Sequence, residues 1–156
     1  MVLASQPGKR PPVGGAAPDF NLALYPDFRG GMTDTVRLSD QRGRVVVLNF
    51  WASGCVECVK ETEALESVWR DYRERGVVVL GVDYLDTESA AYAYLRDFDV
   101  TFPNGIDLRQ SISRLYRITG VPETFFIDRN GVVRTIVIRA LSRQELASQI
   151  EALLAE

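Results

Sequence analysis

The sequence predicts an α/β domain in which a central β-sheet is flanked by helices. Residues 44–51 and 77–82 are short, nearly continuous runs of β-branched and other apolar residues, a composition typical of strands covered on both faces. Between them, residues 56–75 contain neither Gly nor Pro and repeat apolar positions at helical spacing. A strand, a long helix and a second strand in this order favour parallel pairing through a right-handed crossover.

Weaker signals place the elements around these strands. Residues 17–22 alternate polar and apolar positions behind a proline, which predicts a short strand, whereas residues 23–43 have the composition of a loop. A threonine N-cap predicts a helix at 87–98, a Pro-Asn-Gly sequence predicts a loop at 103–105, and residues 109–118 can form another short helix.

Two further strands and a helix are predicted near the carboxyl terminus. Residues 121–128 are rich in strand-forming residues, and the Asp-Arg-Asn-Gly sequence at their end predicts a turn into an antiparallel partner at 132–138. Ser142 and Glu145 have the spacing of a capping box, which predicts a helix over 142–154. Because an antiparallel pair joins parallel strands, the sheet is expected to be mixed.

The length and composition fit one domain. A chain of 156 residues, 46% of them apolar, has material for a single core, which we place at residues 17–156. Residues 1–16 are rich in Pro and Gly and are expected to form a flexible leader. No apolar run approaches the roughly 20 residues that a membrane helix needs, and residues 1–4 are too short for a signal-peptide core.

Charge and residue content exclude several classes of function. The net charge of −3, without a concentrated basic face, argues against nucleic acid as a partner. No histidine occurs, which excludes histidine-based acid-base catalysis and the histidine-containing zinc and haem sites. The two cysteines lie three residues apart and cannot form the multi-bridge framework of small secreted domains.

Both cysteines fall at the start of the predicted long helix. A buried strand ending at Trp51 and a three-residue turn place Cys55 at the helix N-terminus, where unpaired N–H groups and the helix dipole stabilise a thiolate. Cys58 lies one turn further on the same face, within disulfide reach and more shielded. This arrangement predicts thiol-disulfide exchange, with Cys55 as the nucleophile and Cys58 as the resolving thiol.

Two other interpretations of the pair stay open. A Cys-x-x-Cys pair can be half of a zinc site, although carboxylates would have to supply the other ligands because no further Cys or His exists. Two inert core cysteines are the second interpretation, although the spacing and the position between a strand and a helix argue against it.

Three segments resemble the thioredoxin superfamily. Residues 49–61 (NFWASGCVECVKE) and 120–128 (GVPETFFID), with the opening at 17–20 (APDF), are similar to the TlpA/ResA/CcmG (DsbE) branch of extracytoplasmic thiol-disulfide oxidoreductases. The resemblance covers residues 17–154. It implies a thioredoxin-like fold with an amino-terminal β extension and an insertion between the second core strand and the strand that follows Pro122.

The same resemblance assigns roles beside the cysteines. Pro122 corresponds to the family's cis-proline, which lies against the disulfide and leaves the preceding backbone, at Val121, free to pair with a substrate strand. Without the family, Pro122 would be a trans proline that begins an edge strand. Trp51, Gly54 and Glu57 complete the expected substrate-binding set.

Glu61 matches the carboxylate that this branch places beneath the active site. Without the resemblance it would be an ordinary exposed helix glutamate. Buried near the disulfide, it would have a raised pKa and could carry the proton that Cys58 gains or loses. The implied catalytic residues are therefore Cys55, Cys58 and Glu61, with no metal and no other cofactor.

Two positions depart from the family's usual pattern. Gly54 replaces a common aromatic residue before Cys55, and Glu57 replaces a common proline before Cys58. An extra carboxylate opposes thiolate formation and favours the disulfide, which lowers the reduction potential and shifts the protein toward acting as a reductant. Glu57 is expected to be exposed, which keeps this effect modest.

These observations predict a reductase of protein disulfides. The resemblance implies apocytochrome c or its maturation proteins as candidate substrates. The resemblance implies a location in the periplasm or on the outer face of the cell membrane, with an anchor or signal that these residues lack. It also implies a membrane thiol reductase as electron donor. We expect the protein to be a monomer.

Two other functions are alternatives. A peroxiredoxin-like thiol peroxidase would use the same architecture, but such enzymes usually carry Thr three residues before the reactive cysteine, where this chain has Ala52. A copper-binding thiol chaperone would use Cys55 and Cys58, but copper carriers of this fold have a wider cysteine spacing and a histidine. The acidic stretch at 83–99 could dock a basic partner, although solvated surface is the ordinary state of such a stretch.

Overall fold

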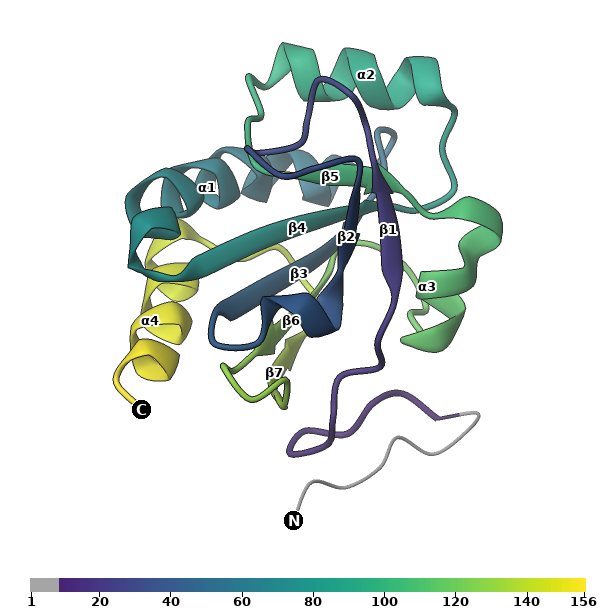
Figure 1. Cartoon of the computed structure of the whole chain (residues 1–156). Coiled ribbons are helices and arrows are strands. Elements are labelled where there is room, and N and C mark those ends of the chain that lie inside the picture. The colour runs from purple at the N-terminus through teal and green to yellow at the C-terminus, as the bar shows by residue number, and fades with distance from the viewer. Residues whose placement is uncertain (1–8) are drawn as a thin grey trace.

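A seven-stranded mixed sheet runs through the computed structural model, which describes residues 9–156, in the order β2-β1-β5-β4-β3-β6-β7 (Figure 1). The strands are β1 (Asn21–Leu24), β2 (Thr35–Arg37), β3 (Val45–Trp51), β4 (Val77–Asp83), β5 (Asn104–Ile106), β6 (Glu123–Ile127) and β7 (Val133–Val137). The α-helices are α1 (Val56–Tyr72), α2 (Glu88–Asp97), α3 (Ser111–Leu115) and α4 (Arg143–Leu154). Short 3₁₀ turns cover Leu38–Gln41, Arg73–Arg75 and Leu108–Gln110.

The most apolar segments form the middle of the sheet. Every residue of β3 and of β4 is buried, and the two strands pair in parallel, with Trp51 and Asp83 opposite each other at their carboxyl ends. β6 pairs with the other side of β3 in antiparallel orientation, and β7 pairs with β6 in the same way. The predicted α/β class and the mixed sheet are therefore confirmed.

Apolar cores lie on both faces of the sheet. One core joins side chains of β3 such as Val47 to side chains of α1, α2 and α4, among them Leu65 and Ile150. The other joins Leu48 to Tyr116, which follows α3. Figure 1 accordingly shows α1 and α4 close together and α3 away from them. None of the helices in the described part of the chain is long and apolar enough to cross a membrane.

Capping residues set the ends of the helices as the sequence predicts. Cys55 is the N-cap of α1, and the Thr87 hydroxyl accepts a hydrogen bond from Ala90 N–H at the start of α2. α1 continues into a 3₁₀ turn and stops at Gly76, whose φ of 80° is readily adopted by glycine. The capping box of α4, between Ser142 and the Glu145 side chain, is present.

The β extension and the insertion implied by the resemblance are both present. β1 and β2 form an antiparallel pair, and α2 and β5 lie between β4 and β6. β5 joins the two parts, because it pairs in parallel with β4 and in antiparallel orientation with β1. The loops predicted at 23–43 and 103–105 are therefore wrong where β2 and β5 form, since strands of three residues are too short to show a periodic pattern.

Part of the expected flexible leader is bound to the domain. Residues 1–8 of that leader lie outside the described residues. Arg10 forms a two-pronged ion pair with buried Glu123, at 2.6 and 3.1 Å, and backbone hydrogen bonds join Gly14 and Gly15 to Val133. The expectation is corrected for residues 10–16, because the partner of Arg10 is 113 positions away in sequence and composition cannot reveal it.

Candidate active site

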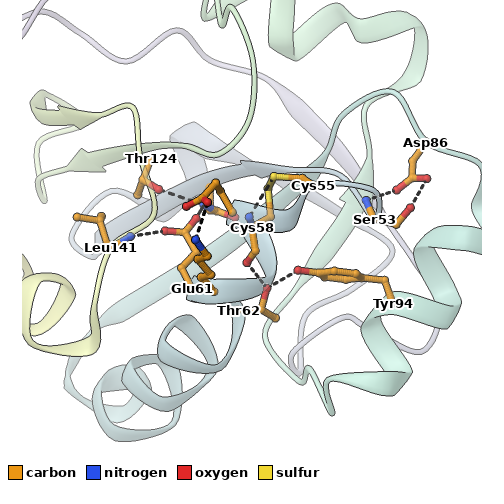
Figure 2. The surroundings of a disulfide bond; sticks show 12 residues. Ser53, Cys55, Cys58, Glu61, Thr62, Asp86, Tyr94, Thr124 and Leu141 are labelled. Carbon is orange, nitrogen blue, oxygen red and sulfur yellow. Dashed lines mark hydrogen bonds and ion pairs between the residues drawn. A yellow bond between two sulfur atoms is a disulfide. The ribbon is translucent and has the colours of Figure 1, made fainter.

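The cysteine pair lies where β3 leads into α1, at the carboxyl end of the central parallel strands (Figure 2). Cys55 and Cys58 are joined by a disulfide, with their Cα atoms 5.2 Å apart. Cys55 Sγ also accepts a hydrogen bond from the Cys58 backbone N–H, at 3.0 Å. The sulfur of Cys55 therefore occupies the position of an N-cap acceptor, where a negative charge is stabilised by free N–H groups and by the helix dipole.

The two cysteines differ in accessibility. Cys58 is 1% exposed, whereas Cys55 is only partly buried. A thiol at Cys55 can be reached by another molecule, whereas the buried thiol at Cys58 is within reach of Cys55. The predicted positions at the helix start, exposed first and shielded second, are confirmed.

Bonds from β4 and its following loop fix the turn before Cys55. The Asp86 carboxylate accepts hydrogen bonds from Ser53 N–H at 2.8 Å and from the Ser53 hydroxyl at 2.7 Å. Tyr84 N–H donates to the Trp51 carbonyl at 2.7 Å. Because these contacts tie residues 51–53 to the end of β4, the turn has a defined path into the helix.

Trp51 lies beneath the turn and away from the surface. Its side chain is 3% exposed, its indole N–H donates to Asn104 Oδ1 at 2.8 Å, and its ring stacks on Tyr94 with centroids 4.9 Å apart. The prediction that Trp51 contacts substrate is therefore corrected. Its position between β5 and α2 makes it a support for the turn.

Glu61 lies one turn beyond Cys58, inside the protein. It is 1% exposed, and its two carboxylate oxygens accept hydrogen bonds from Asn49 Nδ2 at 2.8 Å and from Leu141 N–H at 2.9 Å. Burial raises the pKa of Glu61 to about 7, although these two hydrogen bonds act in the opposite direction. Glu61 is thus buried, as the resemblance implied, and burial shifts its pKa in the implied direction.

The loop before β6 approaches the same end of the sheet. The peptide bond between Val121 and Pro122 is cis, as the resemblance implied. Glu123 follows directly, and besides Arg10 it accepts hydrogen bonds from Thr119 N–H at 3.0 Å and from the Thr119 hydroxyl at 3.2 Å. The buried Glu123 carboxylate therefore holds both ends of the cis-proline loop, residues 119–122.

The two departures from the family pattern are on the surface. Gly54 is exposed, and a Cβ added there would meet no atom within 4 Å, so the site tolerates a side chain but does not contain one. The Glu57 side chain is 55% exposed and forms an ion pair with Lys60 at 2.7 Å. Its exposure is as predicted, and Lys60 offsets part of its charge.

A surface groove lies next to the cysteine pair. It is lined by Glu57, by residues 119–122 of the cis-proline loop and by residues 138–140 that follow β7. Ile138 is 60% exposed, and Val56 at the start of α1 is 72% exposed. The groove thus combines apolar side chains with the backbone of the cis-proline loop.

Several residues of the site could not be found from the sequence. Asn49 bridges Glu61 and the Thr124 hydroxyl, and Asp86 holds Ser53. Asn49 lies in an apolar run, and this exception within a buried strand was the one local signal. Among residues 9–156, no three His, Cys, Asp or Glu side chains gather as a metal-binding group.

A Cys-x-x-Cys disulfide at the amino end of a helix, next to a cis-proline loop and above a buried carboxyl, defines a thiol-disulfide oxidoreductase on a thioredoxin-like domain. Comparisons with known proteins agree. The AhpC/TSA family matches residues 13–136. Thiol-disulfide oxidoreductase ResA of Oceanobacillus iheyensis is 37% identical over 134 residues, which cover 86% of this chain and 69% of that protein.

Further relatives have the same description. ResA of Geobacillus kaustophilus is 32% identical over 141 residues, covering 90% of this chain and 78% of that protein. The solved structure of a Chlorobium tepidum protein described as thiol:disulfide interchange protein DsbE has a TM-score of 0.82 and 32% identity, covering 92% of this chain and 99% of the other. The chain belongs to the AhpC/TSA family and, within it, to the thiol-disulfide oxidoreductases of the ResA type.

Proposed function

We propose that the protein reduces disulfides of protein substrates, with Cys55 as the attacking thiolate and Cys58 as the resolving thiol. The observation that carries this proposal is the asymmetry of the pair: Cys55 is accessible at the N-cap of α1, and Cys58 is 1% exposed. A thiolate is the attacking species in disulfide exchange, and a helix N-terminus lowers the pKa of a thiol.

The reaction begins from the reduced pair. Cys55 thiolate attacks one sulfur of the substrate disulfide, which forms a mixed disulfide and releases the other substrate sulfur as a thiolate. Cys58 then loses its proton and attacks the Cys55 sulfur, which closes the Cys55–Cys58 bond and releases the second substrate thiolate. An external dithiol donor must return two electrons to the pair before the next cycle.

Glu61 is suited to accept the Cys58 proton. It lies one turn along the same helix, and its pKa of about 7 lets it exist in both protonation states near neutral pH. Asn49 and Leu141 hold the carboxylate through neutral donors, and within residues 9–156 no Lys or Arg forms an ion pair with it.

The groove beside the pair fits an extended polypeptide. Val121 is partly exposed ahead of cis-Pro122, so its backbone can pair with a substrate strand, while Ile138 offers an apolar contact. Gly54 leaves the approach to the Cys55 sulfur unobstructed. Glu57 lies at the edge of the groove and opposes thiolate formation, which favours the role of reductant.

We infer the place of this reaction in the cell from the family resemblance. The resemblance of residues 49–61 to the TlpA/ResA/CcmG branch supports a location outside the cytoplasm and apocytochrome c or its maturation proteins as substrates. It also supports a membrane thiol reductase as the donor and action as a monomer.

Trapping with Cys58→Ser tests the proposal. Without its resolving thiol, Cys55 should remain bound to the substrate as a mixed disulfide that dithiothreitol releases, and mass spectrometry identifies the partner. The matched variant Cys55→Ser should trap none. Equal trapping by both variants, or by neither, would overturn the assignment of Cys55 as the nucleophile.

The match to the AhpC/TSA family supports a second candidate, a thiol peroxidase. In that reaction Cys55 thiolate would be oxidised by peroxide to a sulfenate, and Cys58 would displace water to form the disulfide. Stopped-flow oxidation of the reduced protein by hydrogen peroxide, compared with the rate of insulin reduction, separates the two functions. A large preference for peroxide would replace our proposal.

A further inference from the structure

A second buried carboxyl group lies beside the active-site turn. Asp83 ends β4 next to Trp51 and is 1% exposed, which corrects its assignment to a solvated acidic stretch. Its Oδ2 accepts a hydrogen bond from the Tyr25 hydroxyl at 2.8 Å. Its Oδ1 is buried without a hydrogen-bond partner among residues 9–156. An oxygen in this state is costly as part of a carboxylate, but it can carry and donate a proton.

Asp86 lies three residues further and faces the active-site turn. Its two oxygens accept the hydrogen bonds from Ser53 N–H and the Ser53 hydroxyl, and Oδ1 also accepts from Thr87 N–H at 3.1 Å. Figure 2 shows Asp86 reaching Ser53 on the turn that leads to Cys55. Asp86 therefore sets the path of the backbone two residues before the reactive sulfur.

Among residues 9–156, the groups that act on the Asp83 carboxyl are the neutral Tyr25 hydroxyl and the acidic Asp86. The Tyr25 hydroxyl, from the segment after β1, donates to Asp83, while Trp51 on β3 and Ile106 on β5, which pair with Asp83 in the sheet, carry no charge. Asp86, three residues further along the chain, lies near enough to raise the pKa of Asp83. Within residues 9–156 neither aspartate forms an ion pair with Lys or Arg. Burial first, and Asp86 after it, raise the pKa of Asp83 to about 8, although the Tyr25 hydrogen bond lowers it. Glu88 at the start of α2 adds negative charge near Tyr25.

We propose that Asp83 is a positioning residue for the thiol-disulfide reaction, because its protonated carboxyl supports Asp86 in holding Ser53 and so fixes the turn before Cys55. When Asp83 loses its proton, two neighbouring carboxylates repel each other, and the Asp86 bonds to Ser53 weaken. The turn then relaxes at alkaline pH. This inference rests on the proposed function of Cys55 as the attacking thiolate, but the linkage between Asp83 and Ser53 does not.

The linkage is tested in the disulfide form, in which neither cysteine titrates. The Ser53 amide resonance is followed by NMR from mildly acidic to alkaline pH, and it should shift with a midpoint of about pH 8. Asp83→Asn should abolish this shift, because the amide has no proton to lose. Glu61→Gln, which removes the other buried carboxyl with a raised pKa, should leave the shift in place.

A second variant gives the direction of the effect. Tyr25→Phe removes a hydrogen bond that favours the ionised form of Asp83, so the Ser53 midpoint should move to higher pH. A Ser53 amide that does not titrate in the unaltered protein, or that still titrates in Asp83→Asn, would overturn the inference. So would a midpoint that moves to lower pH in Tyr25→Phe.

The effect on chemistry is read from alkylation of Cys55 by iodoacetamide in the Cys58→Ser protein. Plotted against pH, the alkylation rate should rise as the Cys55 thiol ionises and should then show a second inflection of about threefold, which corresponds to about half a pKa unit of the thiol. Asp83→Asn should remove this second inflection. If the Ser53 amide resonance shifts with pH but the alkylation rate lacks this inflection, the positioning role would be overturned. If the Ser53 amide resonance shifts with pH but Cys55 traps no substrate, the proposed function would be overturned. The linkage between Asp83 and Ser53 would still hold.

Discussion

Glu61 and Glu123 are both buried glutamates near the disulfide, yet they are held in opposite ways. Glu61 is 1% exposed and Glu123 is fully buried. In the described part of the chain, the donors to the Glu61 carboxylate are the neutral groups of Asn49 and Leu141, whereas Glu123 receives two hydrogen bonds from the Arg10 guanidinium. The comparison teaches that burial alone does not decide what a carboxyl group does; the charge of its donors does.

This difference separates a proton carrier from an anchor. A carboxylate without a cation loses more by desolvation than neutral hydrogen bonds return, so its proton is held near neutral pH. A carboxylate with a two-pronged guanidinium stays charged and rigid. Glu61 accordingly fits the step in which Cys58 exchanges its proton, and Glu123 fits the fixing of the cis-proline loop.

The largest predicted effect is on stability as a function of pH. The pKa of Glu61 in the folded protein, about 7, lies above its ordinary value of 4.5. The folded state therefore keeps a proton that the unfolded chain releases, so stability from Glu61 is complete below pH 4.5 and is lost as the pH rises through 7. The loss should be about 3 kcal/mol. Urea unfolding of the oxidised protein across this range measures it.

Glu61→Gln should remove this part of the pH dependence. The matched control is Glu63→Gln, which alters an exposed glutamate of the same helix and should keep the slope of the unaltered protein. If stability changes with pH at the same slope in Glu61→Gln and Glu63→Gln between pH 4.5 and 7, Glu61 does not hold a proton in the folded protein. The proposed difference between Glu61 and Glu123 would then fail.

A slightly smaller effect is expected on the rate of the resolving step. Removing a positioned proton acceptor costs on the order of 10²-fold, so Glu61→Gln should slow closure of the Cys55–Cys58 bond by about that factor near neutral pH. Rapid-quench measurement of the mixed disulfide in a single turnover gives this rate. If the Cys55–Cys58 bond closes at an unchanged rate in Glu61→Gln, water and not Glu61 accepts the proton that Cys58 loses.

The parts of the site that the sequence predicted depend on neighbours in the chain. Cys55, Cys58 and the start of α1 follow from a strand, a turn and a helix in direct succession. The cis-proline and the burial of Glu61 came from the family resemblance, because nothing in the helix itself distinguishes Glu61 from Glu63. The central strands were predicted from long apolar runs, which are also a local property of the sequence.

The missed parts depend on contacts between distant segments. Arg10 and Glu123 are 113 positions apart, and Ser53 and Asp86 are 33 apart, so no local pattern records either contact. β5 is three residues long and exists because β4 and β1 offer backbone partners on both sides. Asp83 was missed for the same reason. An acidic stretch predicts solvated surface, and only the position of β4 in the sheet shows that Asp83 is buried.

Arg10→Ala should make Glu123 behave like Glu61. The variant leaves a buried carboxylate without its cation, so we expect a loss of about 2 kcal/mol in the free energy of unfolding at neutral pH, below the usual range for a buried pair because the Arg10 side chain is 25% exposed. Arg10→Lys should recover part of it. Urea unfolding of the unaltered protein and of both variants at neutral pH measures these losses, and an unchanged stability in Arg10→Ala would contradict the role given to the Arg10–Glu123 pair.

The smallest effect concerns Thr119, the neutral donor to Glu123. Thr119→Val removes the hydroxyl that donates at 3.2 Å and keeps the backbone N–H, so it should cost about 1 kcal/mol. In the Arg10→Ala background the same change should cost more, because the hydroxyl is then one of few donors left to a buried carboxylate. A double-mutant cycle of these two variants by urea unfolding measures this coupling. Strictly additive costs would mean that the hydrogen bonds from Arg10 and from the Thr119 hydroxyl stabilise Glu123 independently of each other.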